Sequence, residues 1–234
     1  DPAAIVAALQ AMQTEEDWTG RSVLVTAGPT REWIDPVRFI SNPSTGRMGY
    51  AIAEAAAARG ADVTLISGPT DLPVPGNVTV HRVETTEDML QAVQSELQHV
   101  DVLVMAAAPA DVRPSHRADK KMKKTDVGDA LPLDRTPDIL RTIRPALNGT
   151  FVVGFAAETH EVEQSARDKV ERKGVHLLFA NRVSDGSGKT GFGTETNAGL
   201  LLDGEGSVVR SIDVAPKLTV ANHLLDEVNK RLNP

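Results

Sequence analysis

Two long loops hold most of the side chains in this 234-residue chain that could take part in chemistry. The first loop, residues 27–47, leads from a predicted strand into a predicted helix that begins around Gly46 and Gly49. Glycines there let a phosphate approach the backbone at the positive end of the helix, and Ser44 could cap the helix or donate to phosphate oxygens. Asn42 either forms a turn or supplies a fixed amide donor to a carbonyl or developing oxyanion.

The second loop, residues 109–134, follows a predicted strand ending in three alanines, which leave room for a flat ring against the main chain. Asp111, just beyond them, could bind a ribose or, through oxygen, Mg²⁺. Six cations and one acid between residues 113 and 124 then give a local charge of +5. Basic runs are usually solvated surface. Beside a predicted ligand crevice, this run favours a flexible cover over a triphosphate and a leaving pyrophosphate.

A third group surrounds Phe155, the only aromatic residue at the end of a predicted central strand. Phe155 could stack on a base, and a plain core role is equally compatible with the residue alone. Lys169 and Lys173 follow, four residues apart on one face of a predicted helix. Such a pair is ordinarily surface, and only the neighbouring loops give it interest.

These loops need a scaffold, and short apolar runs alternate with helical patterns along the chain. The expected strands cover residues 22–26, 63–66, 78–83, 102–107, 151–155 and 177–180, with a hairpin formed by 200–202 and 208–212. The expected helices cover residues 48–59, 86–99, 137–147, 161–173 and 217–232. This alternation predicts an α/β fold: a Rossmann-like, doubly wound, mostly parallel sheet with helices on both faces and a C-terminal β-hairpin. Both long loops follow strand carboxyl ends, where ligands bind in such sheets.

Composition limits the function further. Lys and Arg number 25 against 32 Asp and Glu, a net charge of −7, so no global field favours nucleic acid or an anionic membrane. The absence of cysteine excludes disulfides, thiolate metal sites and a cysteine nucleophile. No apolar run approaches the roughly 20 residues of a membrane helix. We therefore expect a cytoplasmic protein that binds neither nucleic acid nor membrane.

The sequence lacks the motifs of several classes of enzyme and nucleotide-binding protein. The loop at residues 27–47 has no Gly-Lys-Ser/Thr of a P-loop, and its glycines come too late after the strand for a dinucleotide motif. The six histidines have no ligand spacing, and no serine lies in a Gly-x-Ser-x-Gly elbow. The only tyrosine, Tyr50, is followed four residues later by Glu54 rather than by the lysine of short-chain dehydrogenases.

The ordered motifs nevertheless form one pattern. They are Thr26-Ala-Gly-Pro-Thr-Arg-Glu32, Asp35-Pro-Val-Arg38-Phe-Ile-Ser-Asn42, Ser44-Thr-Gly-Arg-Met-Gly49, Ala106-Ala-Ala-Pro-Ala-Asp111, Lys121-Met-Lys-Lys124 and Gly154-Phe-Ala-Ala-Glu158. From about Arg21 to the C-terminus the chain resembles the phosphopantothenoylcysteine synthetase family, the C-terminal half of bifunctional bacterial coenzyme A biosynthesis proteins. The resemblance implies a ligase domain over residues 21–234. It also implies that residues 1–20, read as a short helix over 3–12 and a polar linker, connect to a flavin-dependent decarboxylase domain in the parent chain.

The resemblance also implies a two-step ligation with CTP as co-substrate and Mg²⁺ bridging its phosphates. The carboxylate of 4′-phosphopantothenate attacks the α-phosphate of CTP, which gives an acyl-cytidylate and pyrophosphate. The amine of L-cysteine then displaces CMP to form the amide. Similar enzymes are homodimers in which a lysine-rich loop covers the partner's site.

By the same resemblance, Asn42 stabilises the acyl-cytidylate, Arg38 holds the substrate phosphate or carboxylate, and Lys121 contacts the triphosphate. The metal ligand, where the protein supplies one, is Asp111. The full set expected to contact the nucleotide is Gly28, Ser44, Gly46, Met105, Ala106, Ala107, Asp111, Lys121, Pro137, Asp138, Ile139, Leu140, Phe155, Lys169 and Lys173. Pro43 and the short lysine-rich loop depart from the family pattern.

Two other functions stay open at this level. An NAD(P)-dependent reductase on a similar fold would require a Tyr/Lys pair, which the sequence lacks. A non-catalytic nucleotide-binding domain would bind CTP without releasing pyrophosphate. The choice of CTP over ATP rests on the family resemblance alone.

Overall fold

The computed structural model describes residues 16–123, 130–158, 162–182, 191 and 193–233. Its centre is an eight-stranded sheet. The strands are β1 (Ser22–Ala27), β4 (Asp62–Ser67), β5 (Val78–Arg82), β6 (Val102–Met105), β9 (Phe151–Glu158), β10 (Leu177–Arg182), β11 (Thr196–Asp203) and β12 (Val208–Pro216). Their order across the sheet is β12-β11-β10-β9-β6-β1-β4-β5. All neighbouring pairs are parallel except β10–β11 and β11–β12, so the predicted mostly parallel sheet with a C-terminal hairpin is confirmed.

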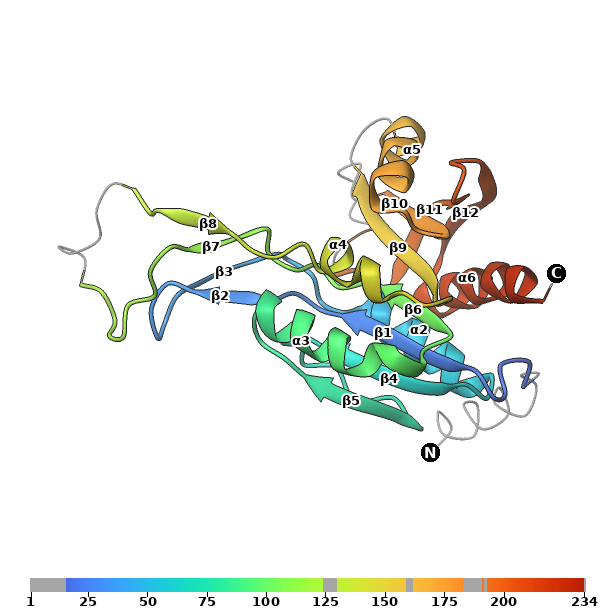
Figure 1. The fold of residues 1–234 in the computed structure, drawn as a ribbon, viewed down its shortest axis with the longest axis horizontal. Coiled ribbons are helices and arrows are strands. Elements are labelled where there is room, and N and C mark those ends of the chain that lie inside the picture. The colour runs from blue at the N-terminus through green and yellow to red at the C-terminus, as the bar shows by residue number, and fades with distance from the viewer. Residues whose placement is uncertain (1–15, 124–129, 159–161, 183–190, 192, 234) are drawn as a thin grey trace.

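Helices cover both faces of this sheet (Figure 1). One face carries α2 (Arg47–Ala58) and α6 (Lys217–Leu232), and the other carries α3 (Thr86–Glu96), α4 (Ile139–Ile143) and α5 (Val162–Lys173). Strand β1 shows why. Val23 and Val25 pack in the cluster that contains α2 and α6, whereas Leu24 between them packs in the cluster that contains α3 and α4. A continuous apolar run is what a strand buried on both faces requires.

The direction of winding reverses beside β1. The chain passes from β1 through α2 to β4 and β5, then crosses by α3 to β6 on the other side of β1. The loops after β1 and β6 therefore diverge from neighbouring carboxyl ends, and the backbones of Pro29 and Ala108 form a bridge just beyond the sheet. A crevice at such a switch point is the usual ligand site of an open α/β sheet.

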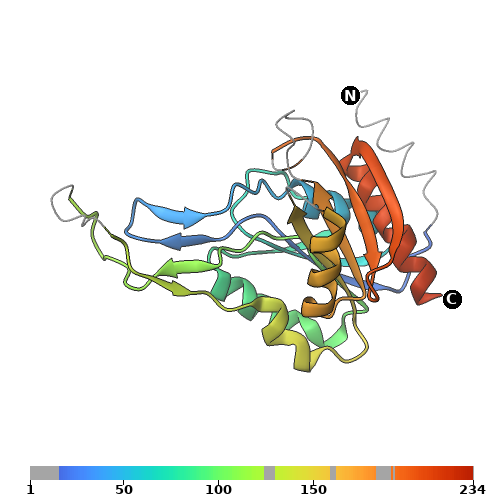
Figure 2. The same ribbon diagram turned by 90° about the horizontal axis from the view of Figure 1, so that it is seen from above.

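Each of the two long loops contains a hairpin element that the sequence did not predict. The first holds β2 (Arg31–Trp33) paired with β3 (Phe39–Ser41), and the second holds β7 (Val112–Pro114) paired with β8 (Leu133–Arg135). The two pairs lie side by side and project from the body of the molecule (Figures 1 and 2). We call β2, β3, β7, β8 and the described residues between them the arm. Three-residue strands in charged, proline-containing sequence carry no alternating pattern, which is why they were missed.

Helix ends follow local capping with two corrections. Thr85 and Asp88 form a capping box at the start of α3, since each side chain accepts from the other residue's backbone N–H. Ser44 does not cap α2, because the N-cap is Gly46 in the left-handed conformation, without a side-chain cap. The helix predicted over 137–147 is shorter: α4 has Asp138 as its N-cap, and a 3₁₀ turn, η2 (Arg144–Ala146), follows it.

The core also includes a residue from the expected linker. Trp18 is 1% exposed and packs in the same cluster as α2 and α6, and its backbone N–H donates to the Arg59 carbonyl. The polar residues around Trp18 concealed this role in the sequence. The helix expected over residues 3–12 lies outside the described residues.

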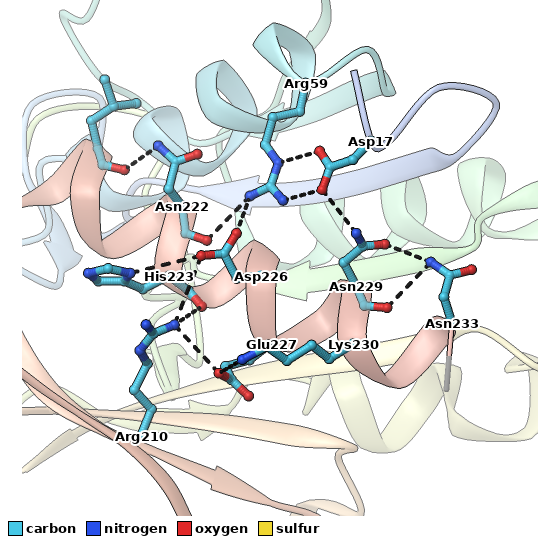
Figure 3. Close-up of polar contacts among 11 residues, drawn as sticks. Asp17, Arg59, Arg210, Asn222, His223, Asp226, Glu227, Asn229, Lys230 and Asn233 are labelled. Atoms are coloured by element: carbon cyan, nitrogen blue, oxygen red, sulfur yellow. Dashed lines mark hydrogen bonds and ion pairs between the residues drawn. The ribbon is translucent and has the colours of Figure 1, made fainter. Parts of the chain in front are cut away.

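Arg59 fixes this N-terminal segment to α6. Its guanidinium donates to both carboxylate oxygens of Asp17 and to Asp226, with Arg59 Nη1 2.8 Å from Asp226 Oδ1 (Figure 3). Asn229 of α6 also donates to Asp17. The packed part of the chain therefore begins before Arg21. In the part of the chain that the structure describes, no helix is both long and apolar enough to cross a bilayer.

Candidate functional site

Two adjoining pockets lie at the carboxyl ends of the parallel strands, each with a volume of about 410 Å³. They share four lining residues, Ala107, Asp111, Phe155 and Lys173. We call the pocket beside α2 the first pocket and the pocket beside α4 the second pocket.

Most of the predicted site residues meet here. The first pocket is lined by Asn42, Ser44, Gly46, Ala106 and Lys169 in addition to the shared residues. The second pocket is lined by Met105, Pro137, Asp138, Ile139 and Leu140 in addition to the same residues. Gly28, Arg38 and Lys121 line neither pocket. The structure thus brings the three predicted loops together but leaves two expected cations, Arg38 and Lys121, on the arm.

Gly28 has a packing role at the floor of the first loop. Gly28 and Gly46 both have positive φ, 80° and 78°, and a Cβ on Gly46 would lie 3.3 Å from the Gly28 Cα and 2.7 Å from the Thr70 methyl carbon. Side chains at these two positions would be strained by conformation and by space. The two glycines let the end of β1 lie against the start of α2, and residues 42–46 before this helix line the first pocket.

Asn42 is held by the loop after β6. Its Nδ2 donates to the Ala108 carbonyl at 3.2 Å and to the Pro109 carbonyl at 2.9 Å. Both amide hydrogens are therefore used, and the Oδ1 acceptor remains for a ligand. This differs from the donor role considered from the sequence: in this arrangement Asn42 can accept a hydrogen bond in the first pocket without breaking a contact.

A buried chain of hydroxyls, which the sequence did not reveal, holds the same loop from below. The Ala110 N–H donates to Thr30 Oγ1, Thr30 Oγ1 lies 2.9 Å from Thr86 Oγ1, and Thr86 Oγ1 donates to the carboxylate of Glu32 at 2.8 Å. The Thr86 N–H also donates to Glu32. Glu32 thus lies at the N-terminus of α3, where the helix dipole favours an anion.

Lys173 contributes a cation to both pockets. Its Nζ donates to the Phe155 carbonyl at 3.3 Å. Burial lowers the pKa of Lys173, and Lys169 lowers it further, while Asp138 and Asp111 oppose the shift. Two lysines close together in a partly dry pocket favour a polyanionic ligand, because a bound anion would relieve both effects.

Phe155 is packed on one side and accessible on the other. Its ring packs edge-to-face on Phe179 with centroids 5.4 Å apart, and it is also partly exposed, lining both pockets. The small side chains of Ala106 and Ala107 lie in the neighbouring strand end. This leaves an apolar floor on which a flat ring could lie.

Sequence reasoning missed the far wall of the first pocket. Asn181, Asn197 and Lys217 line it, and Asn181 Oδ1 is buried without a hydrogen-bond partner. Lys217 Nζ donates to the carbonyls of Gly191, Thr194 and Thr196. Burial lowers the pKa of Lys217 to about 8. Asn181 on β10, Asn197 on β11 and Lys217 at the start of α6 are single polar residues, and none of them belongs to a sequence motif by which it could be found.

The donor set for a cation is sparse. Asp111 is exposed and faces both pockets, and the described residues contain no cluster of three or more histidine or acidic side chains that could enclose a metal. A single carboxylate beside a polyanion site fits Mg²⁺, which usually keeps several waters and binds through one or two carboxylates plus substrate phosphates.

Comparison with known proteins gives a consistent result. The family model described as the DNA/pantothenate metabolism flavoprotein C-terminal domain matches residues 18–232. The coenzyme A biosynthesis bifunctional protein CoaBC of Bacillus subtilis is 43% identical over 219 residues, which cover 93% of this chain and 53% of that protein. CoaBC of Escherichia coli K12 is 42% identical over 214 residues, covering 90% of this chain and 52% of that protein. The chain spans about half the length of these relatives.

Solved structures share the fold. A crystal structure of the C-terminal domain of CoaBC superposes with a TM-score of 0.79 at 38% identity, covering 93% of this chain and 98% of that one. A Cab2 mutant in complex with phosphopantothenate-cysteine has a TM-score of 0.71 at 17% identity, covering 90% of this chain and 87% of that one. The second likeness concerns the fold alone.

Proposed function

The chain belongs to the DNA/pantothenate metabolism flavoprotein C-terminal domain family, and on that premise we propose that it is a CTP-dependent phosphopantothenate–cysteine ligase of coenzyme A biosynthesis. Its product would be 4′-phosphopantothenoyl-L-cysteine, with CMP and pyrophosphate. The CoaBC relatives act in coenzyme A biosynthesis, which supports the proposal.

One observation carries the proposal: three loops that are far apart in the sequence meet around two joined pockets with an apolar floor and a cationic wall. The second pocket, beside α4, is lined by Phe155, Leu140 and Asp138, and it would take the base and ribose. The junction of the pockets, at Lys173, suits the phosphates, and the first pocket suits the acyl substrate.

The first step would transfer the cytidylyl group from CTP to the carboxylate of 4′-phosphopantothenate, with pyrophosphate leaving. Such a step needs positioning and charge neutralisation more than a protein nucleophile. Lys169 and Lys173 would offset the charge that accumulates on the leaving pyrophosphate. Bound Mg²⁺ would supply further charge neutralisation, and Asp111 is the residue placed to hold it.

The second step would be attack of the cysteine amine on the acyl carbon, with departure of CMP. The free Oδ1 of Asn42 would accept a hydrogen bond from that amine and orient it, because both Nδ2 hydrogens are already used by Ala108 and Pro109. The amine must lose a proton when the amide forms, and an acceptor there stabilises the developing positive charge.

The competing functions have less support. In a reductase of the short-chain type a tyrosine hydroxyl must face the substrate. The Tyr50 hydroxyl instead lies 3.0 Å from Ser67 Oγ and accepts from Thr70 Oγ1, and Tyr50 lines neither of the two pockets. A nucleotide-binding domain without catalysis stays as an outcome of the assay below.

The test is pyrophosphate release with Mg²⁺, 4′-phosphopantothenate and CTP, with and without cysteine, and again with ATP. The proposal expects sustained release and CMP formation only when cysteine is present. Sustained turnover with ATP alone would keep the ligase and overturn the nucleotide. CTP binding without pyrophosphate release under any condition would favour a non-catalytic domain.

We also propose a homodimer. The arm exposes Val37, Phe39, Leu131 and Leu133, each at least 40% exposed. Because Arg38 and Lys121 on that arm line neither pocket of their own protomer, packing of the arm against a second copy would both cover the apolar residues and bring the two cations to the partner's pockets. Light scattering should give twice the monomer mass, and Leu133→Ser should shift the equilibrium toward monomer.

The relatives of about twice this length fit a parent chain with a flavin-dependent decarboxylase domain.

A further inference from the structure

Asp35 is buried in the arm with five hydrogen bonds to its carboxylate. Its side chain is 0% exposed. Oδ1 accepts from the backbone N–H of Val37 and Arg38 at 2.8 and 2.9 Å. Oδ2 accepts from Arg38 Nε and Nη2 at 3.0 and 2.5 Å and from the Met122 N–H at 3.2 Å. The two oxygens therefore have different partners. Oδ1 stabilises the turn, whereas Oδ2 binds the Arg38 guanidinium and the segment that contains Met122.

That second segment follows β7. The Arg38 Nη2 also donates to the Met122 carbonyl at 3.2 Å, and the Ala118 N–H donates to the Ile34 carbonyl at 2.9 Å. The Arg117 guanidinium lies 5.8 Å from the centre of the Trp33 ring. The turn between β2 and β3 is thus fixed to residues 117–122, more than 80 positions later in the chain.

These contacts determine how Arg38 can meet a ligand. Nε and both hydrogens of Nη2 are used by Asp35 and Met122, so only Nη1 of the guanidinium keeps unused donors. The Arg38 side chain is 41% exposed, so this edge is accessible. Lys121 is the residue directly before Met122, and its backbone is placed by the same carboxylate.

We propose that Asp35 is a positioning residue that joins Arg38 and the Lys121 segment into one preformed cationic unit on the arm. The proposal rests on the ligase function, in which these two cations contact the anionic substrates. We call the bonds from Asp35 Oδ2 to the Arg38 side chain and to the Met122 N–H the clamp. Without the clamp, Arg38 would sample many rotamers and the Lys121 segment would lose its attachment, so substrate binding would carry an added ordering cost. Asp35 itself touches no substrate. It acts through Arg38 and Met122.

Two substitutions separate the turn from the clamp. Asp35→Asn keeps an oxygen for the Val37 and Arg38 N–H groups, but its amide nitrogen cannot accept from the Arg38 side chain or Met122. Asp35→Ala loses both sets of bonds. Asp119→Asn, an exposed carboxylate in the same segment, is the matched control. We expect Asp35→Asn and Asp35→Ala to raise KM for 4′-phosphopantothenate or CTP by tenfold or more with a smaller change in kcat, and Asp119→Asn to leave both constants unchanged.

A second measurement does not depend on activity. The chain contains no cysteine, so spin labels on Val37→Cys and Lys120→Cys, diluted with unlabelled protein, report only the distance between the two segments. We expect one narrow distance distribution, which broadens when Asp35→Asn is added. An inactive parent enzyme with a narrow distribution would overturn the ligase function but not the clamp. An Asn variant that keeps both the parent KM and the narrow distribution, whatever the Ala variant does, would reduce Asp35 to a turn residue and overturn the proposal.

Discussion

The hydroxyls of Thr30 and Thr86 lie 2.9 Å apart in the space between the arm and α3, and each is at most 1% exposed. They connect a carboxylate to a loop of the site, because Glu32 accepts from Thr86 while Thr30 accepts from the Ala110 N–H. A chain of hydroxyls that ends on a carboxylate is polarised along its length and strengthens each bond. The loop carrying Asp111 is therefore held from below by this chain.

Breaking the chain should affect both stability and activity. Thr86→Val keeps the shape of the side chain but removes the hydroxyl, which leaves the Thr30 hydroxyl without its acceptor and Glu32 with one fewer donor. Loss of a buried hydrogen-bond partner costs about 1–3 kcal/mol. We expect the free energy of unfolding in urea to fall by that amount and kcat/KM to fall with it.

The matched control for that experiment is Thr79→Val, an exposed threonine on the edge strand β5. It makes the same chemical change and should leave stability within about 0.5 kcal/mol. If Thr86→Val were as mild as Thr79→Val, the hydroxyl chain would have no energetic role.

Asn42→Asp tests the orientation of the amide. A carboxylate at this position would oppose the carbonyls of Ala108 and Pro109, since none of the three groups could donate. The side chain should turn away from these carbonyls and lose its fixed position. We expect CTP binding to persist while product formation falls by 100-fold or more, with acyl-cytidylate detectable by mass spectrometry after acid quench. Normal turnover would remove Asn42 from the reaction.

Lys173→Met separates ligand binding from stability. Burial already disfavours the Lys173 ammonium in the folded state, as its lowered pKa indicates, so its removal should not decrease Tm. A hydrogen bond to a charged group is worth about 1.5–3 kcal/mol, so CTP affinity measured by calorimetry should fall between tenfold and 200-fold. Arg172→Met, an adjacent exposed cation, is the control and should change affinity far less. Equal losses in the two variants would indicate general electrostatic attraction instead.

Much of the fold could be predicted because the pattern of apolar residues within a short segment is enough to indicate a buried strand or an amphipathic helix. The run from Val23 to Val25 and the Thr85 cap of α3 are examples in which neighbouring residues determine the outcome. Site residues next to strand ends, such as Ala106 and Phe155, could be placed for the same reason.

The arm and the buried contacts that support the site loops could not be predicted, because they depend on pairings between residues far apart in the sequence. The sequence around Asp35 indicates a turn residue and does not show that Asp35 binds Met122. The role of Glu32 likewise depends on its hydrogen bond with Thr86, 54 positions later. Trp18 lies among polar neighbours and reveals its burial only when α2 and α6 are in place. Sequence patterns report which face is buried, whereas these contacts follow from how the loops cross.

Lys217 predicts an unusual dependence of stability on pH. Burial lowers its pKa to about 8 in the folded protein, whereas an unfolded lysine titrates near its ordinary value of 10.5. Between these values the unfolded chain binds more protons than the folded one, so stability due to this group rises as pH increases from about 8 to 10.5. The full shift corresponds to at most about 3 kcal/mol. Lys217→Met should remove this rise, and its own stability should change less over the same range. Urea unfolding of both proteins between pH 7 and 10.5 measures the difference, in which contributions common to the two proteins cancel. Parallel curves for the two proteins would mean that the three carbonyls of Gly191, Thr194 and Thr196 compensate the ammonium fully for its burial.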